Sequence, residues 1–244
     1  MQSVTAKPLL FERLRQSSPQ LSVGMLTADW LQLGAGLKIL EAASVQLLHF
    51  DVMDGVFCPI LTMGSPVVAG CRTTLYKDVH LMIDEPLAKL ESYVAAGADI
   101  VTVHAESCRH PHRVLQALGG MTNTNDPARG LVRGVALNPG TPLEVLQPLL
   151  DELELVTLLA VNPGWGGQKF IHATVGRLAQ LKAMLAKSGC AALVAVDGGI
   201  TRNNIAEVLA LGPDIVVTGS AVFDGKDPAA NAAFMAQAAL AARR

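Results

Sequence analysis

Three things are scarce in this chain, and each scarcity excludes a class of protein. Aromatic residues make up only 4% of the 244 residues, which leaves little material for base-stacking platforms or sugar-stacking clefts. Charged residues make up 16% and the net charge is −2, so no broad basic surface faces a nucleic-acid backbone. No stretch approaches the ~20 apolar residues that cross a bilayer. We therefore expect a protein that binds neither nucleic acid nor membrane.

Cysteine motifs are also missing. The four cysteines form no C-x-x-C pair, and no histidine is assigned to any of them as a catalytic partner, so nucleophilic cysteine chemistry is unsupported. Hydrophobic residues make up 50% of the chain, enough for one large core without disulfides. We expect a single domain over residues 1–244, with residues 1–20 as an N-terminal extension, in the reducing cytoplasm.

Short apolar runs recur at intervals that fit one strand, one helix and two loops. Several of them, such as residues 155–161, lack the two-residue alternation of a half-exposed strand, and such strands are covered on both faces. The predicted strands are Leu21–Leu26, Leu47–Asp51, Lys77–Met82, Ile100–His104, Val132–Leu137, Leu155–Val161, Ala191–Val196 and Ile215–Thr218. Eight parallel strands of this kind predict an α/β fold, a single (β/α)8 TIM barrel.

Helical spacing of apolar residues separates these runs. The clearest helical segments are Trp30–Ala43, Pro86–Ala96, Pro142–Leu150, Ala173–Lys187, Thr201–Leu211 and Pro228–Arg243. Residues 97–101 (GADIV) recur as residues 212–216 (GPDIV), in which a helix-ending glycine leads into a buried strand. A doubly wound open sheet is the competing architecture, but its usual G-x-G-x-x-G turn after the first strand is missing. The repeat favours the barrel.

Polar side chains gather where the predicted strands end, which is where barrel enzymes work. His49 and Asp51 close the second strand two residues apart, so their side chains share one face. His80 lies in the third strand and Asp197 follows the seventh. Taken singly, each is better explained as a rim residue or a loop cap, but burying all of them unpaired would be costly. Together they suit a divalent ion, Zn²⁺ first, with Mn²⁺, Fe²⁺ or Co²⁺ also compatible.

Glycine-rich loops follow the last three predicted strands. They contain Gly164, Gly166 and Gly167, then Gly198 and Gly199, and finally Gly219 with Ser220. Backbone N–H groups at glycines approach an anion closely, and this corner of such a barrel commonly holds a phosphate. Any one of the loops is better explained as a tight turn, whereas the combination of the three favours a phosphate site.

Other polar residues receive lesser roles. His104 and Glu106 end the fourth strand and are assigned a supporting or structural role, and Asp54 forms a turn with Gly55. His110, His112 and His172 are expected at the surface.

At these residues the chain resembles the ribulose-phosphate 3-epimerase family, over about Leu21 to Phe223. The matching stretches are residues 26–29 (LTAD), 49–55 (HFDVMDG), 78–82 (DVHLM), 97–99 (GAD), 103–106 (VHAE), 137–142 (LNPGTP), 161–170 (VNPGWGGQKF), 196–199 (VDGG) and 219–223 (GSAVF). The resemblance implies that His49, Asp51, His80 and Asp197 bind the catalytic metal and that Asp51 and Asp197 are the acid/base pair. It also implies that the seven loop residues above surround the substrate phosphate and that Met53 and Met82 line the substrate space.

The implied enzyme is an isomerase of carbohydrate metabolism, a metal-dependent 3-epimerase of a phosphorylated ketose. The default reaction converts D-ribulose 5-phosphate to D-xylulose 5-phosphate by two-base proton transfer through an enediolate, as in pentose phosphate metabolism. Two bases are needed because a proton leaves one face of carbon 3 and another returns to the opposite face. Association into a homo-oligomer is expected, as is common for such barrels.

Four positions depart from the family pattern. Gly24, Val56, Ile60 and Leu159 replace the usual serine, histidine, asparagine and methionine, and all are expected near the substrate or the loop over it. The pattern is closer to divergent paralogues, such as the epimerase-like proteins of autoinducer-2 processing operons. Two alternatives therefore stay open: an epimerase or isomerase of another keto-phosphate, such as a hexulose 6-phosphate or a phosphorylated autoinducer-2 derivative, and a non-catalytic barrel that binds a sugar phosphate.

Overall fold

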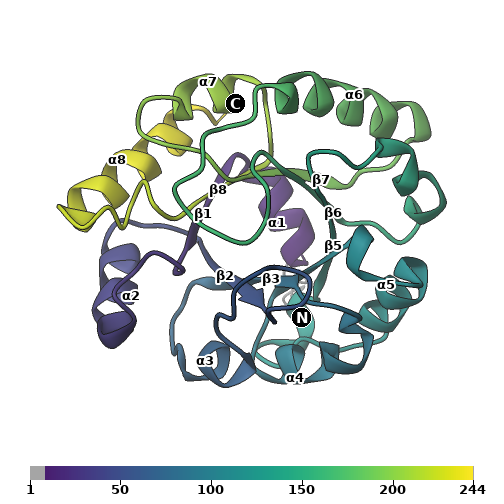
Figure 1. Ribbon diagram of the computed structural model, residues 1–244, viewed down its shortest axis with the longest axis horizontal. Coiled ribbons are helices and arrows are strands. Elements are labelled where there is room, and N and C mark those ends of the chain that lie inside the picture. Colours follow the sequence, from purple (N-terminus) through teal and green to yellow (C-terminus); the bar gives the residue numbers. More distant parts are fainter. Residues whose placement is uncertain (1–8, 244) are drawn as a thin grey trace, which may run out of the picture.

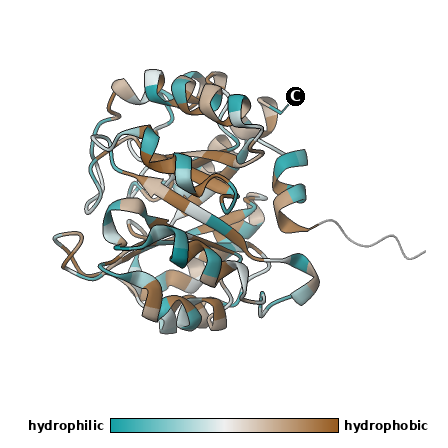
Figure 2. Ribbon diagram, turned by 90° about the vertical axis from the view of Figure 1, so that its right-hand side faces the viewer, coloured by the Kyte–Doolittle hydropathy of each residue, from teal (hydrophilic) through white to brown (hydrophobic). Residues whose placement is uncertain are grey.

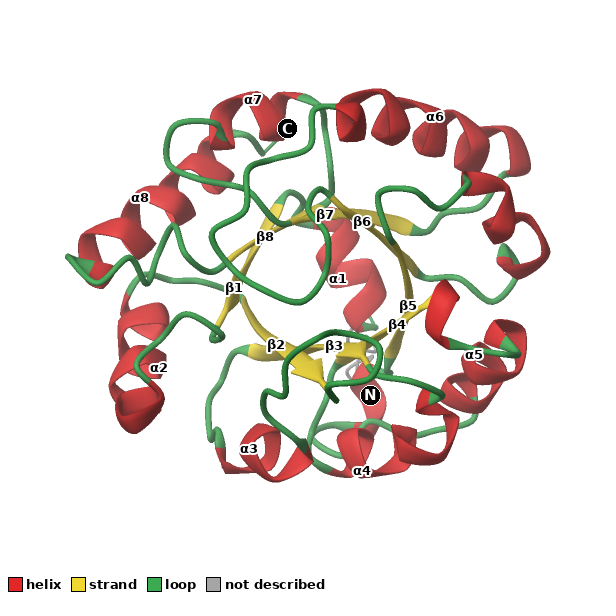
Figure 3. Cartoon of the chain, in the orientation of Figure 1, coloured by secondary structure: helices red, strands yellow, loops and turns green. Residues whose placement is uncertain are grey.

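The computed structural model describes residues 9–243, and its central feature is a closed ring of eight parallel strands (Figures 1 and 3). The strands are β1 (Gln20–Gly24), β2 (Leu47–Met53), β3 (Tyr76–Met82), β4 (Ile100–His104), β5 (Val132–Leu137), β6 (Leu155–Leu159), β7 (Leu193–Asp197) and β8 (Ile215–Thr218). Each predicted strand overlaps one of them. β1 pairs with both β2 and β8, which closes the ring. The predicted TIM barrel is thereby confirmed.

Helices surround the ring on its outer side (Figure 3). They are α1 (Leu10–Gln16), α2 (Leu33–Ala42), α3 (Ser65–Gly70), α4 (Leu90–Ala95), α5 (Pro111–Gly119), α6 (Ala173–Ser188), α7 (Ile205–Ala210) and α8 (Pro228–Ala241), with α1 at one end of the barrel instead of its side. The apolar spacing does not single out α1, α3 or α5. Within the described range, no helix combines the length and apolar character that a bilayer crossing needs.

One predicted helix forms a different kind of turn. The segment expected as an α-helix over Pro142–Leu150 is a 3-10 helix, Leu143–Leu149, with Pro148 inside it. Proline has no N–H to donate to the residue four positions earlier, which explains why a continuous α-helix does not form there. The start of α7 is also later than predicted, because the side chain of Asn204 accepts a hydrogen bond from the Thr201 backbone N–H at 2.7 Å and holds a turn before the helix.

The barrel interior changes character from one end to the other. At the N-terminal ends of the strands, Leu10 and Leu14 of α1 pack against a layer of apolar side chains. That layer consists of Leu47, Ile100, Val132, Leu155, Leu193 and Ile215, each at or near the first residue of its strand. In Figure 2, α1 is the helix next to the grey trace, and it covers this end of the barrel. Polar side chains are therefore left for the opposite end.

The β2–β3 register carries this gradient along two neighbouring strands. The inward residues pair as Leu47 with Tyr76, His49 with Asp78, Asp51 with His80, and Met53 with Met82. The residues between them, such as Phe50 and Val79, belong to the main core under the helices. Both faces of these two strands are buried, so inward and outward residues differ in the type of side chain and not in solvent exposure. Residues 1–8 of the predicted N-terminal extension lie outside the described residues.

Candidate active site

Four titratable side chains converge at the C-terminal mouth of the barrel. His49 and Asp51 come from β2, His80 from β3 and Asp197 from the end of β7. One ligand atom of each lies within 4.8 Å of the others. These are the residues that the sequence places at strand ends, and the closed ring brings β7 opposite β2 and β3. The structure therefore gathers the whole predicted set in one place.

The distances inside the cluster suit an ion in the middle. His49 Nε2 lies 3.3 Å from Asp51 Oδ1 and 3.9 Å from Asp197 Oδ2. His80 Nδ1 lies 3.7 Å from Asp51 Oδ1 and 3.5 Å from Asp197 Oδ2. Both nitrogen atoms are buried, and neither has a hydrogen-bond partner. Such orphaned atoms are costly, whereas a divalent cation about 2 Å from each ligand atom would satisfy both nitrogens and both carboxylates.

The pKa shifts in the cluster also favour positive charge between the carboxylates. Burial opposes a charge on His49, but the carboxylates of Asp78 and Asp51 outweigh that cost and raise its pKa well above the ordinary value. Burial is likewise outweighed at His80, whose pKa is raised by Asp197 and Asp51. Burial would raise the pKa of Asp51, yet His49 and His80 lower it. A divalent cation would replace the protons on the two rings.

Sequence reasoning missed one member of the site. Asp78 is buried below the cluster, and its Oδ2 lies 2.8 Å from His49 Nδ1. The hydroxyl of Ser22 donates to the same oxygen at 2.8 Å. This carboxylate fixes the ring so that Nε2 faces the cluster. The available signal was the spacing of two between Asp78 and His80, which puts both on one face of β3.

A second support stands behind the other histidine. His80 Nε2 lies 2.9 Å from His104 Nε2, and His104 Nδ1 lies 3.1 Å from Glu106 Oε2. Burial lowers the pKa of His104 to about 4, so that ring is neutral. Burial would raise the pKa of Glu106, but hydrogen bonds from His104, Thr141 and the Asn138 backbone lower it to about 2. The sequence places His104 and Glu106 in a supporting role, and their contacts are of that kind.

The glycine loops divide into two groups. Gly164, Gly167, Gly198, Gly199 and Ser220 line a hollow of about 90 Å³ that also reaches Asp51 and Asp197. Gly166 and Gly219 do not line it. A Cβ at Gly166 would meet the methyl group of Thr27 at 3.2 Å, and one at Gly219 would meet the Gly24 carbonyl oxygen at 3.2 Å. These two glycines allow loops to pack closely behind the hollow.

Backbone conformation requires glycine at the hollow itself. Gly199 has a φ of +68°, and a Cβ there would lie 2.5 Å from the Phe170 backbone nitrogen. Gly164 has a φ of +125° and faces Pro59. Gln168 fastens the same β6 loop, because its side chain donates to the carbonyl oxygens of Asn162 at 2.6 Å and Trp165 at 3.0 Å. Side chains are thus kept away from this corner, and the space stays open for a small ligand.

Apolar side chains lie beside the cluster. Met53 and Met82 line the same hollow and pack with Cys58, as a small apolar group separate from the main core. Burial, with Asp54 and Asp51 nearby, raises the pKa of Cys58 to about 11, so its thiol stays protonated. Asp54 makes the predicted turn by accepting the backbone N–H groups of Val56 and Phe57, both at 3.0 Å. His110, His112 and His172 are exposed, as predicted.

The four departures from the family pattern fall in two places. A Cβ at Gly24 would lie 3.5 Å from Asp51 Oδ2, and Leu159 lines the hollow, so both positions border the cluster. Val56 and Ile60 are 73% and 37% exposed on the loop after β2. Two of the positions are therefore placed to affect a bound substrate directly, and the other two belong to the loop beside the mouth.

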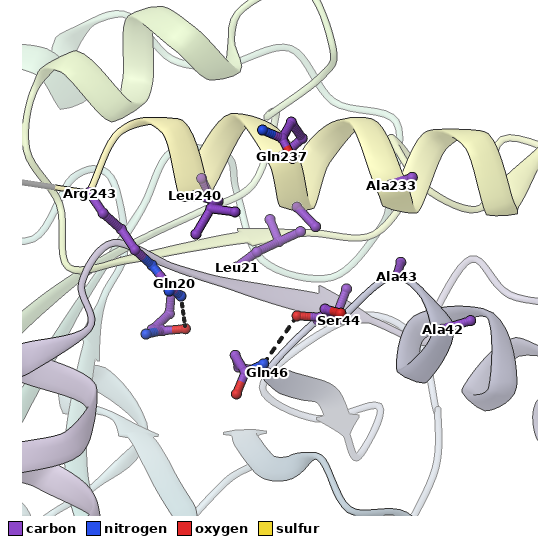
Figure 4. A pocket seen from close by; sticks show the side chains of 13 residues that line it. Gln20, Leu21, Ala42, Ala43, Ser44, Gln46, Ala233, Gln237, Leu240 and Arg243 are labelled. Atoms are coloured by element: carbon purple, nitrogen blue, oxygen red, sulfur yellow. Dashed lines mark hydrogen bonds between the residues drawn. The ribbon is translucent and has the colours of Figure 1, made fainter.

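A larger hollow, of about 370 Å³, lies outside the barrel between β1, the end of α2 and α8 (Figure 4). Three of its polar side chains are engaged: Arg243 donates to Gln20 Oε1 at 3.4 Å, and Gln46 donates to the Ser44 carbonyl oxygen at 3.1 Å. None of its described lining residues is a histidine, carboxylate or cysteine. The smaller hollow at the mouth is the candidate site, because the titratable cluster lies there.

Solved structures share this fold. The 3-hexulose-6-phosphate synthase of Salmonella typhimurium superposes with a TM-score of 0.66 at 18% identity, covering 92% of this chain and 100% of that chain. The protein named KGPDC from Streptococcus mutans gives a TM-score of 0.69 at 15% identity, covering 91% and 97%. At such identities the likeness concerns the fold alone.

Sequence relatives are much more similar. Ribulose-phosphate 3-epimerase of Bacillus subtilis is 40% identical over 211 residues, which cover 85% of this chain and 94% of the relative. The chloroplastic ribulose-5-phosphate-3-epimerase of Arabidopsis thaliana is 41% identical, with 88% and 75% covered. A Salmonella typhi protein named "Putative epimerase LsrE" is 40% identical, with 85% and 82% covered. Sequence identity is therefore about the same to the two relatives named for ribulose phosphate and to the one named only as a putative epimerase.

The sequence profile of the family called "Ribulose-phosphate 3 epimerase family" matches residues 20–223, which run from the first residue of β1 to the loop after β8. The match therefore spans the whole ring of strands together with the cluster and the glycine loops. With this match and the relatives above, the chain belongs to the ribulose-phosphate 3-epimerase family.

Proposed function

We propose that this protein is a metal-dependent 3-epimerase of a phosphorylated ketose, with D-ribulose 5-phosphate and D-xylulose 5-phosphate as the default pair. The observation that carries the proposal is the pair of buried, unpartnered nitrogens, His49 Nε2 and His80 Nδ1, facing two carboxylates. Membership of an epimerase family agrees with it. The cation would be held by His49, Asp51, His80 and Asp197, and Zn²⁺ is the first candidate for it. When bound, it would supply Lewis-acid stabilisation of negative charge on the substrate.

Asp51 and Asp197 would be the two bases. They approach the hollow from β2 and β7, so a carbon atom held between them has one carboxylate on each face. One carboxylate would take the proton from carbon 3, and the other would return a proton to the opposite face of the resulting enediolate. Met53 and Met82 would exclude water from the exposed carbon, which limits loss of the intermediate.

The glycine loops would hold the phosphate. Gly164, Gly166, Gly167, Gly198, Gly199, Gly219 and Ser220 are the proposed set. The glycines that line the hollow would bring backbone N–H groups next to the phosphate, and Ser220 would add a hydroxyl donor. Phosphate bound there would fix the distance from the charged end of the sugar to carbon 3 and thereby align the reacting atom with the carboxylates.

A second candidate keeps the reaction and changes the sugar. Gly24 beside Asp51 and Leu159 in the hollow are the observations that favour another keto-phosphate, such as a hexulose 6-phosphate or a phosphorylated autoinducer-2 derivative. Comparing kcat/KM across these substrates separates the two candidates. A non-catalytic sugar-phosphate-binding barrel is the least favoured alternative, because binding alone has no use for two converging carboxylates. Cytoplasmic location and homo-oligomeric assembly remain predictions.

The decisive experiment measures solvent deuterium at carbon 3. Wild-type protein should incorporate deuterium during turnover, and removal of metal with a chelator should stop the exchange until a divalent cation is restored. Asp51→Asn and Asp197→Asn should each lower epimerisation by several orders of magnitude, because one face of the carbon loses its base, while the remaining base can still exchange the proton of the epimer that it faces. Asp84→Asn, the same substitution at an exposed carboxylate after β3, is the matched control. Epimerisation that persists in both site variants would refute the two-base mechanism.

A further inference from the structure

A series of hydrogen bonds connects the titratable cluster to the end of β4 and to Glu106 just after it. His80 Nε2 lies 2.9 Å from His104 Nε2, and His104 Nδ1 lies 3.1 Å from Glu106 Oε2. His80 and His104 are almost completely buried, at 1% and 0% exposure. The proposed proton transfers use neither His104 nor Glu106, so this series of hydrogen bonds must have another role.

The contacts of Glu106 determine which atoms donate and which accept in this series of hydrogen bonds. Glu106 Oε1 accepts the backbone N–H of Asn138 at 2.8 Å and the hydroxyl of Thr141. A carboxylate only accepts, so the His104 nitrogen that faces Oε2 must be the one that carries a proton. A neutral imidazole has one N–H, which leaves His104 Nε2 as an acceptor. His80 must therefore donate through Nε2, so that once its ring is neutral the lone pair lies on Nδ1.

That lone pair faces the cluster. His80 Nδ1 is the buried atom without a hydrogen-bond partner, 3.5 Å from Asp197 Oδ2 and 3.7 Å from Asp51 Oδ1. A cation binds an imidazole only through an unprotonated nitrogen. The cluster-facing nitrogen of His49 is kept unprotonated in a simpler way, because the other ring nitrogen, Nδ1, lies 2.8 Å from the Asp78 carboxylate and donates to it directly. His80 instead reaches a carboxylate through a second imidazole.

We propose that Glu106 is a positioning residue for the metal site and that it acts through His104 to hold His80 in the tautomer whose Nδ1 accepts a divalent cation. This inference rests on the proposed metal site. Glu106 also fastens the loop after β5 through Asn138 and Thr141, so a purely structural role is the competing explanation. The two explanations differ in what they predict for metal affinity.

The test is the affinity for Zn²⁺ of the full-length Glu106→Gln variant, measured by competition with a chromophoric chelator. Glutamine has the shape of glutamate but one acceptor oxygen and one NH₂ group, so it cannot accept from donors on both sides. With its NH₂ group toward His104, the chain of donors reverses and a proton is left on His80 Nδ1. We expect Zn²⁺ affinity to fall about 10- to 100-fold, the usual effect of removing such a partner.

Thr141→Val is the matched control. It removes a donor to the same carboxylate without changing what His104 faces, so Zn²⁺ affinity should be unchanged while thermal stability falls slightly. Long-range ¹⁵N–¹H spectra of the Zn²⁺-loaded wild type should show the His80 proton on Nε2 and the His104 proton on Nδ1. The opposite protonation pattern, or equal affinity in wild type and Glu106→Gln, would overturn the inference.

A second pair of variants covers the case in which Glu106→Gln does not fold. Glutamine at position 104 can still accept from His80 Nε2, whereas leucine cannot, so His104→Gln should bind Zn²⁺ more tightly than His104→Leu. Equal affinities would contradict the proposal. If the wild-type protein itself bound no Zn²⁺ or other divalent cation, the metal site and this inference would both be wrong; if only the variant comparison fails, the metal site stands.

Discussion

At the scale of single residues, the cluster could be predicted, but its supports could not. His49, Asp51, His80 and Asp197 stand at strand ends, and a barrel has one place where all such ends meet. Asp78 supports His49 across the β2–β3 pairing, and that pairing pattern is a matter of register, which a single sequence does not fix. The connection from His80 to Glu106 additionally needs the positions of two rings in space.

Glu106 gives a prediction about stability in acid. Its pKa is lowered from 4.5 to about 2, so its contribution to stability is complete above pH 4.5 and is lost as the pH falls through 2. Urea unfolding of wild type and Glu106→Gln should therefore differ most above about pH 5, by on the order of 2 kcal/mol after a discount for solvent screening at this exposed residue, and converge toward pH 2. A difference that stays constant over this range would show that the carboxylate charge is not what stabilises the fold.

At the scale of elements, strands were easier to predict than the segments between them. Each apolar run had to be a strand because it is too short for a buried helix, and parallel pairing follows from the helices in between. The 3-10 helix over Leu143–Leu149 was not predicted, although Pro148 in its middle was the available signal. The glycine loops were found from their glycines and from their position after predicted strands, but which glycines line the hollow depends on how three loops pack together.

Two glycines with nearly the same φ provide a test at this scale. Gly199 has a φ of +68° and no room for a Cβ, while Gly189, which ends α6, has a φ of +69° and nothing within 4 Å of that position. Gly189→Ala should cost about 1–2 kcal/mol of unfolding free energy from backbone strain alone. Gly199→Ala should cost about 1–3 kcal/mol more from overpacking, and should also raise KM for a phosphorylated substrate.

Chemical denaturation and steady-state kinetics on the same preparations check both effects. If Gly189→Ala raised KM as much as Gly199→Ala does, the loop after β7 would not be part of the phosphate site. Equal losses of stability in the two variants would mean that the β6 and β7 loops are not packed as closely as the Gly199–Phe170 contact requires.

At the scale of the whole molecule, the two ends of the barrel have different tasks. α1 closes the N-terminal end with Leu10 and Leu14, and the titratable cluster occupies the other end. The sequence predicts the barrel but treats the segment before the first strand as an extension. Helix α1 is short, and its burial depends on a ring of apolar residues assembled from many strands, which no local pattern in residues 10–16 reveals.

Separation of the two ends predicts that stability and catalysis can be changed independently. Leu14→Ala, at 2% exposure, should lower the unfolding free energy by about 2–5 kcal/mol while kcat and KM stay near the wild-type values at low temperature. Leu9→Ala, the same substitution at a side chain that is 54% exposed, is the control and should change neither. A large fall in kcat for folded Leu14→Ala would show that the two ends are coupled.

The pairing that closes the ring joins the first strand to the last. Gln20 of β1 lies in register with Ile215 of β8, so the ring cannot be completed until every residue from β1 to β8 has been synthesised. Until then the outer edge of β1 exposes unpaired N–H and C=O groups, and the apolar layer that α1 covers is incomplete because it lacks Ile215. Such distant contacts make folding slow, and the incomplete barrel is the species in which chaperones would find an open strand edge to protect.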